Sequence, residues 1–178
     1  ILINARKDFE DLAISNNWID KDPRLCILYS AYSHILLKRV PLLVCIREPI
    51  NVAVSLYART GISINLGLCM WFIYNHHISK FLTKNDSFYF YDEFLNASET
   101  NSELHLYQQC CKTLETMGTK IASFDQFKEI LNQRVKANLN RCSSLASALN
   151  EKICDLELLN TCNDAYQKFH ASQKDLNI

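Results

Sequence analysis

The sequence predicts an α/β fold in which part of a parallel sheet is flanked by helices and the C-terminal part is helical. A continuous apolar run at residues 40–46, VPLLVCI, is typical of a parallel strand buried on both faces. Helical patterns follow it, and the aromatic segment 88–91 then predicts a second strand. The 178 residues contain no repeat or proline-rich linker, so we expect one domain over residues 1–178.

The segment before the first strand predicts two helices separated by a turn. Residues 4–15 and 25–37 carry apolar side chains at helical spacing, and residues 21–24 form the turn between them. Pro41 stands near the start of the strand, where a residue without an N–H group is tolerated.

A proline and a glycine delimit the helix that follows the first strand. Pro49 suits a first helical turn, where its missing N–H is not needed, and Gly61 is placed to end the helix just after Arg59. Asn51, Ser55 and Arg59 are expected to form one polar stripe on this helix. Its apolar face is expected to consist of Val52, Ala53, Leu56 and Tyr57.

The remainder of the chain is predicted to be mainly helical. The segment 65–82 is apolar on nearly all sides, which is typical of a buried helix. Asp92 is expected to cap the turn or helix that follows the second strand. Further helical patterns cover residues 103–117, 124–131 and 145–169.

Composition and charge exclude several classes of protein. The 19 lysines and arginines balance the 19 aspartates and glutamates, so nothing favours nucleic acid as a partner and any anion site must be local. No run approaches the roughly 20 apolar residues of a transmembrane helix. The eight cysteines form no CxxC pair and the histidines show no zinc spacing, so no metal is expected. Dispersed cysteines favour a reducing compartment, the cytoplasm, with a lumenal one left open.

The end of the first strand carries a candidate phosphate site. Arg47 follows the strand directly, and ligands of open parallel sheets lie outside the carboxyl ends of the strands. Its guanidinium offers fork-like donors that suit a phosphate, and Ser55 and Arg59 lie on one face of the next helix. The spacing alone fits equally well with surface residues of an ordinary strand–helix unit.

The segment REPINVAVSLYAR, residues 47–59, resembles the 3'-phosphate-binding segment of sulfotransferases that use phosphoadenosine phosphosulfate (PAPS). In that family an arginine ends a strand and a serine follows eight positions later. Tyrosylprotein sulfotransferases add a second arginine four residues on, where this chain has Arg59. The resemblance implies that Arg47 and Ser55 contact the 3'-phosphate with help from Arg59, and that the fold is the P-loop-like sulfotransferase fold.

Two further segments extend this resemblance over residues 18–95. The turn that begins at Lys21 resembles a lysine-containing turn of the same family, which implies a catalytic lysine that offsets charge on the departing sulfuryl group. The segment YDEFL resembles an element whose tyrosine approaches the nucleotide, which implies a cofactor contact for Tyr91. Without the resemblance, Lys21 can equally be interpreted as an exposed lysine in a turn. Tyr91 can be interpreted as an aromatic residue of the core.

The resemblance implies transfer of a sulfuryl group from PAPS to a hydroxyl or amine acceptor, with adenosine 3',5'-bisphosphate as the other product. The loop that holds the 5'-phosphosulfate and the general base are not found, so the sulfotransferase domain is expected to be incomplete at its N-terminus. Two alternatives remain open. One is a P-loop kinase-like phosphotransferase, and the other is a truncated non-catalytic domain that binds a partner through its helical C-terminal part.

Overall fold

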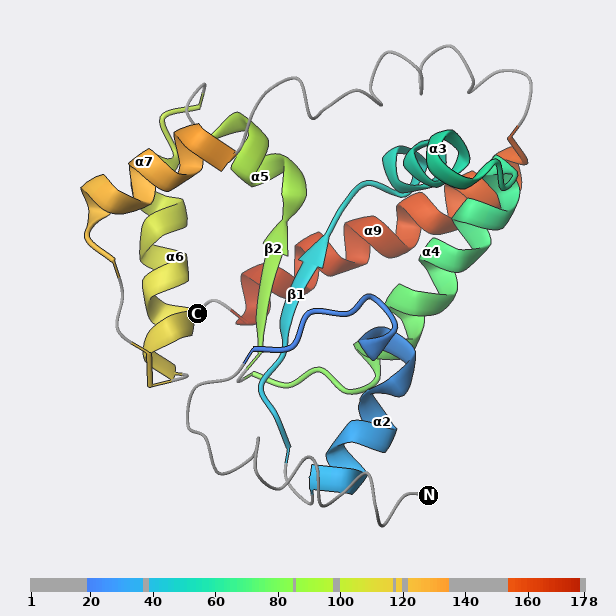
Figure 1. Ribbon diagram of the computed structural model, residues 1–178. Coiled ribbons are helices and arrows are strands. Elements are labelled where there is room, and N and C mark those ends of the chain that lie inside the picture. The colour runs from blue at the N-terminus through green and yellow to red at the C-terminus, as the bar shows by residue number, and fades with distance from the viewer. Residues whose placement is uncertain are drawn as a thin grey trace.

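The computed structural model describes residues 19–36, 39–84, 86–97, 100–116, 118–119, 122–134 and 154–176. In this part of the chain seven helices surround a two-stranded parallel sheet, which confirms the predicted α/β class with helices dominating (Figure 1). The predicted helix at residues 4–15 lies outside the described residues. Residues 145–153, the first part of the last predicted helix, lie outside them as well.

The described helices and strands follow the predicted order along the chain. They are α2 (Leu25–Leu36), β1 (Leu43–Ile46), α3 (Pro49–Thr60), α4 (Ile64–Ser79), β2 (Ser87–Phe90), α5 (Tyr91–Asn96), α6 (Glu103–Thr116), α7 (Phe124–Arg134) and α9 (Leu156–Leu176). The two strands run parallel, with Leu43 opposite Ser87 and Ile46 opposite Phe90. Their carboxyl ends therefore meet at one edge of the sheet.

Local chemistry sets the limits of α3 and α4. Pro49 is the first residue of α3, and Gly61 ends the helix with a left-handed φ of 74° while its N–H donates to the Tyr57 carbonyl at 2.8 Å. Both limits agree with the prediction. Ser63 begins α4, because its Oγ accepts the Leu66 N–H at 3.2 Å.

β1 is shorter than the predicted strand. Pairing with β2 begins only at Leu43, because Pro41 has no N–H to donate and the N–H of Leu42 is taken by the side chain of Asp86 at 2.7 Å. The apolar run thus predicts the strand correctly but not where its ladder starts.

β1 is also not buried on both faces, so that part of the prediction is wrong. Val44 and Ile46 face the core, whereas Leu43 is 56% exposed and Cys45 is exposed as well. The described sheet has only two strands, and helices α3, α4 and α9 cover only the face on which Val44 and Ile46 lie. A strand with apolar residues on both faces is buried on both faces only where other elements pack against each of them.

The larger core lies between the sheet and helices α3, α4 and α9 (Figure 1). It contains sixteen buried side chains: Tyr29, Val44, Ile46, Ile50, Ala53, Val54, Ile64, Leu68, Trp71, Ile78, Phe88, Phe90, Leu159, Cys162, Tyr166 and Phe169. On α9, Phe169 packs on Phe88 and His170 stacks on Phe90 with ring centroids 3.4 Å apart. The C-terminal helix is therefore part of this core.

A smaller cluster covers the opposite face of β2. Tyr89 packs there with Ala97, Leu106 and Leu131, which come from the segment containing α5, α6 and α7. The Tyr89 hydroxyl lies 2.7 Å from Thr113 Oγ1 of α6, so this buried polar pair is satisfied. β2 is consequently covered on both faces, unlike β1.

The buried face of α3 differs from the predicted one. Ile50, Ala53 and Val54 are buried, whereas Tyr57 is 41% exposed, so the predicted apolar face is only partly correct. Ala53 lies at a close contact with α4, where an added Cβ on Gly67 would lie 2.8 Å from the Ala53 Cα. Tyr57 lies one turn later on the same side of α3, but residues 57–60 at the C-terminal end of the helix are all exposed, so the core no longer covers it.

α4 is buried on one side only, although its sequence is apolar on nearly all sides. Leu68 and Trp71 are buried, whereas Leu66 and Ile73 are 50% and 55% exposed. No helix in the described ranges is long and apolar enough to span a bilayer.

A buried carboxylate ties together the segments that lead into the two strands. The Asp86 side chain is fully enclosed, forms an ion pair with Arg39, and accepts the N–H groups of Leu42 and Thr83, each at 2.7 Å. Leu42 immediately precedes β1 and Asp86 immediately precedes β2. The carboxylate therefore sets the register at which the two strands begin.

Replacing Asp86 with alanine should lower the free energy of unfolding by about 3 kcal/mol, because it leaves two N–H groups and Arg39 without their acceptor. Chemical denaturation followed by circular dichroism measures this change. Asp125→Ala, an exposed position at the start of α7, should change stability by less than about 0.5 kcal/mol. Equal effects of the two substitutions would contradict the role of Asp86.

Candidate functional site

The carboxyl edge of the sheet places Arg47 beside Tyr91. Each residue follows its strand directly, and the last residues of the two strands, Ile46 and Phe90, are partners in the ladder. The guanidinium carbon of Arg47 lies 4.7 Å from the centroid of the Tyr91 ring, a cation–π contact. Two side chains that the sequence assigns to cofactor binding are thus brought together by the pairing of distant segments.

The backbone of Arg47 is held from the opposite side by α4. The indole Nε1 of Trp71 donates to the Arg47 carbonyl at 2.9 Å, and Trp71 is itself buried. Arg47 therefore has its main chain fixed by one helix and its side chain packed on another. The contact between Trp71 and Arg47 could not be predicted from the sequence. The sequence indicates only that a buried indole N–H needs some acceptor, and not which one.

Glu48 and Asn51 form a hydrogen bond at the start of α3. Asn51 Nδ2 donates to Glu48 Oε2 at 2.6 Å, and Asn51 is buried. Asn51 is therefore not part of an exposed polar stripe with Ser55 and Arg59, which corrects the prediction. Its amide is buried because the first turn of α3 packs against the core beside Ile50.

Ser55 and Arg59 lie one turn apart further along α3. Ser55 is half-buried, Arg59 is exposed, and Arg59 Nε donates to the Ser55 carbonyl at 3.3 Å. Ser55 is about 9 Å along the helix axis from Pro49, given a rise of about 1.5 Å per residue. A ligand group within reach of both Arg47 and Ser55 would have to lie over the first two turns of α3.

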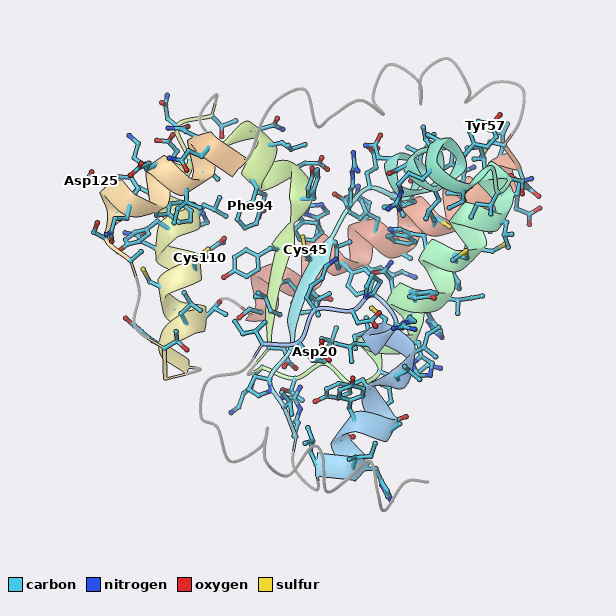
Figure 2. The ribbon with its side chains drawn as sticks, in the orientation of Figure 1. Asp20, Cys45, Tyr57, Phe94, Cys110 and Asp125 are labelled. Atoms are coloured by element: carbon cyan, nitrogen blue, oxygen red, sulfur yellow. The ribbon has the colours of Figure 1, made fainter. Side chains whose placement is uncertain are left out.

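Lys21 lies in an exposed segment that leads into α2. Its neighbour Asp20 accepts a hydrogen bond from the Tyr32 hydroxyl of α2 at 3.1 Å. Figure 2 shows Asp20 well away from Phe94 of α5 and from Tyr57 of α3. The structure thus brings together Arg47 with Tyr91 and Ser55 with Arg59, and it places Lys21 with α2.

Helix α9 contributes Tyr166 to the same edge. Its hydroxyl donates to Asp92 Oδ2 at 3.5 Å, and its ring packs edge-on against Phe90 and Trp71. Burial, followed by the charges of Asp92 and Glu48, raises the pKa of Tyr166 well above its usual value, so the hydroxyl keeps its proton. Nothing in the sequence around Tyr166 predicts its position, since α9 is far along the chain.

Asp92 does not cap α5, contrary to the prediction. The helix begins at Tyr91, so Phe90 is the capping residue and Asp92 lies within the first turn. An acidic side chain there is favourable, because the first turn of a helix carries partial positive charge. The strand runs directly into the helix and leaves no residue between them for a polar cap.

The edge also holds carboxylates close to Arg47. Burial raises the pKa of Glu48, the charge of Asp92 raises it further, and Arg47 acts in the opposite direction. In the described residues no group of three or more histidine, cysteine, aspartate or glutamate side chains is arranged to hold a metal ion. The arrangement provides an arginine and a helix N-terminus for an anion, with carboxylates beside them.

Comparisons with known proteins add no assignment to this site. No protein-family model, curated protein or solved structure matches the chain. The sulfotransferase resemblance therefore rests on the residues of this sequence alone.

Replacing Tyr91 with leucine should release the Arg47 side chain, because an aliphatic side chain offers no ring face for a guanidinium. The NMR signal of Arg47 Nε–H should lose its ring-current shift, and stability should fall by about 0.5–1 kcal/mol. Tyr91→Phe is the matched control, since it keeps the ring and should preserve both properties. An Arg47 signal that is unchanged in Tyr91→Leu would refute the contact.

Proposed function

We propose that the carboxyl edge of β1 and β2 is the 3'-phosphate side of a PAPS site, and that the chain is a sulfotransferase acting on a hydroxyl or amine acceptor. The observation that carries this proposal is the position of Arg47. It stands at the carboxyl end of a parallel strand, directly before α3, and packs on Tyr91 at the end of the neighbouring strand.

Two physical features favour an anion at this position. The first turn of α3 has N–H groups with no partner inside the helix, and the helix dipole adds partial positive charge there. The Arg47 guanidinium supplies a full charge and fork-like donors that match phosphate oxygens. Tyr91 limits where this guanidinium can move and Trp71 holds the Arg47 main chain, which lowers the entropy cost of binding.

The remaining assigned residues fit a ligand that extends along α3. Ser55 would donate its hydroxyl to the 3'-phosphate, and Arg59, one turn later, would add positive charge. The reaction is an in-line attack of the acceptor oxygen or nitrogen on sulfur, in which the bond to the bridging phosphate oxygen breaks. Lys21 would offset charge on that oxygen, which requires the segment before α2 to approach the bound donor.

The carboxylates Glu48 and Asp92 favour a second candidate, a kinase-like phosphotransferase. Carboxylates at strand ends can hold the magnesium ion that accompanies a nucleoside triphosphate. Ligand preference separates the two functions, because a PAPS site recognises the 3'-phosphate without magnesium. A kinase-like site would instead prefer ATP with magnesium.

Replacing Arg47 with alanine should weaken binding of adenosine 3',5'-bisphosphate about 10- to 100-fold, the effect of losing a charge-assisted hydrogen bond to phosphate. Isothermal titration calorimetry in EDTA measures this affinity. Arg24→Ala is the control, because Arg24 is an exposed arginine that pairs with Asp22 in the turn before α2. Equal affinity of wild type and Arg47→Ala, or tighter binding of ATP with magnesium, would contradict the proposal.

A further inference from the structure

Helices α4 and α9 pack against each other (Figure 1), and three free cysteines lie at this contact. Cys69 lies on α4, Cys162 lies in the second turn of α9, and Cys154 lies just before α9. The Sγ of Cys162 donates to the Leu68 carbonyl of α4 at 3.6 Å. A thiol of one helix thus contacts the main chain of the other, one residue before Cys69.

Cys69 lies on the side of α4 that faces α9. Asn65, one turn earlier on the same side, accepts the N–H of Asp155 at the start of α9 at 2.9 Å. By standard peptide geometry, the Leu68 carbonyl oxygen lies about 2.8 Å from the Cα of Cys69. The Sγ of Cys162 is 3.6 Å from that oxygen, so it lies at most about 6.4 Å from the Cα of Cys69. A Cys69 side chain directed at α9 can close most of this gap.

Electrostatics identify the same neighbour. The pKa of Cys162 is raised to about 11, first by burial, then by the charge of Cys69 and then by that of Cys154. Cys69 is thus the thiol that acts most strongly on Cys162. The two thiols differ in access, because Cys69 is half-buried and open to a small oxidant, whereas Cys162 is fully buried.

We propose that Cys69 and Cys162 form a disulfide bond when the folded chain meets a hydroperoxide. The Cys69 sulfur first attacks the peroxide, whose O–O bond breaks, so that Cys69 becomes a sulfenic acid and water or an alcohol leaves. The Cys162 sulfur then attacks the Cys69 sulfur, and the S–O bond breaks as the hydroxyl leaves as water with the Cys162 proton. The two thiols lose two electrons, which the hydroperoxide gains. This inference does not depend on the proposed function.

The bond would fasten α9 to α4. Because α9 supplies Phe169 to the core and Tyr166 to the candidate site, the bond would hold both side chains in place. The raised pKa of Cys162 makes the second step slow near neutral pH, since the attacking species is the thiolate. The bond is therefore expected to form under sustained exposure to the oxidant.

The test is treatment of the reduced whole chain with hydrogen peroxide, followed by alkylation of free thiols, proteolysis without reduction and mass spectrometry. Wild type should give a disulfide-linked pair of peptides that joins Cys69 to Cys162. The midpoint of thermal unfolding should rise by about 5–10 °C, because the bond closes a long loop of the unfolded chain. A reductant should reverse this rise.

Two variants separate the roles of the thiols. Cys162→Ser, in which the new hydroxyl can still donate to the Leu68 carbonyl, should lose the bond and leave Cys69 as a sulfenic acid that dimedone traps. Cys154→Ser is the matched control and should form the bond as wild type does. A wild-type chain that forms no disulfide, or that joins Cys69 to Cys154 instead, would overturn the proposal.

Discussion

The buried carboxylate of Asp86 is the constraint on which the rest of this structure depends. By accepting the N–H groups of Leu42 and Thr83, it fixes where β1 and β2 begin relative to one another. The strands then end together, and Arg47 meets Tyr91 at the shared edge. A slip of one residue would turn the following side chains to opposite faces and separate this pair. A buried carboxylate at one end of the sheet thus determines the geometry at the other.

The helices that form the core also support the candidate site. Trp71 of α4 is a buried core residue, and its indole N–H fixes the Arg47 carbonyl. Tyr166 of α9 fills the space between Trp71 and Phe90, and its hydroxyl reaches Asp92. The fold and the proposed ligand site therefore depend on the same side chains. Substitutions in α4 or α9 are expected to affect both properties, since neither helix can shift without moving the strand ends.

Local signals could be predicted from the sequence, whereas contacts between distant segments could not. Pro49 and Gly61 delimit α3 as predicted, because their backbone requirements do not depend on the rest of the fold. The burial of Asn51 and the exposure of Tyr57 could not be predicted, since they depend on which turns of α3 pack against the core. In the candidate site, Arg47 and Tyr91 could be selected from the sequence, because each belongs to a motif and directly follows a predicted strand. Trp71 and Tyr166 come from later helices that carry no such motif.

The central claim is that Arg47, positioned by strand pairing, recognises a 3'-phosphate. The most direct measurement is an NMR titration of the Arg47 Nε–H signal with adenosine 3',5'-bisphosphate and, separately, with adenosine 5'-monophosphate. We predict a saturable shift with the bisphosphate and at most a small shift with the monophosphate, because only the first ligand carries the 3'-phosphate. An Arg47 signal that responds equally to both nucleotides, or that stays constant while the bisphosphate binds, would contradict the claim.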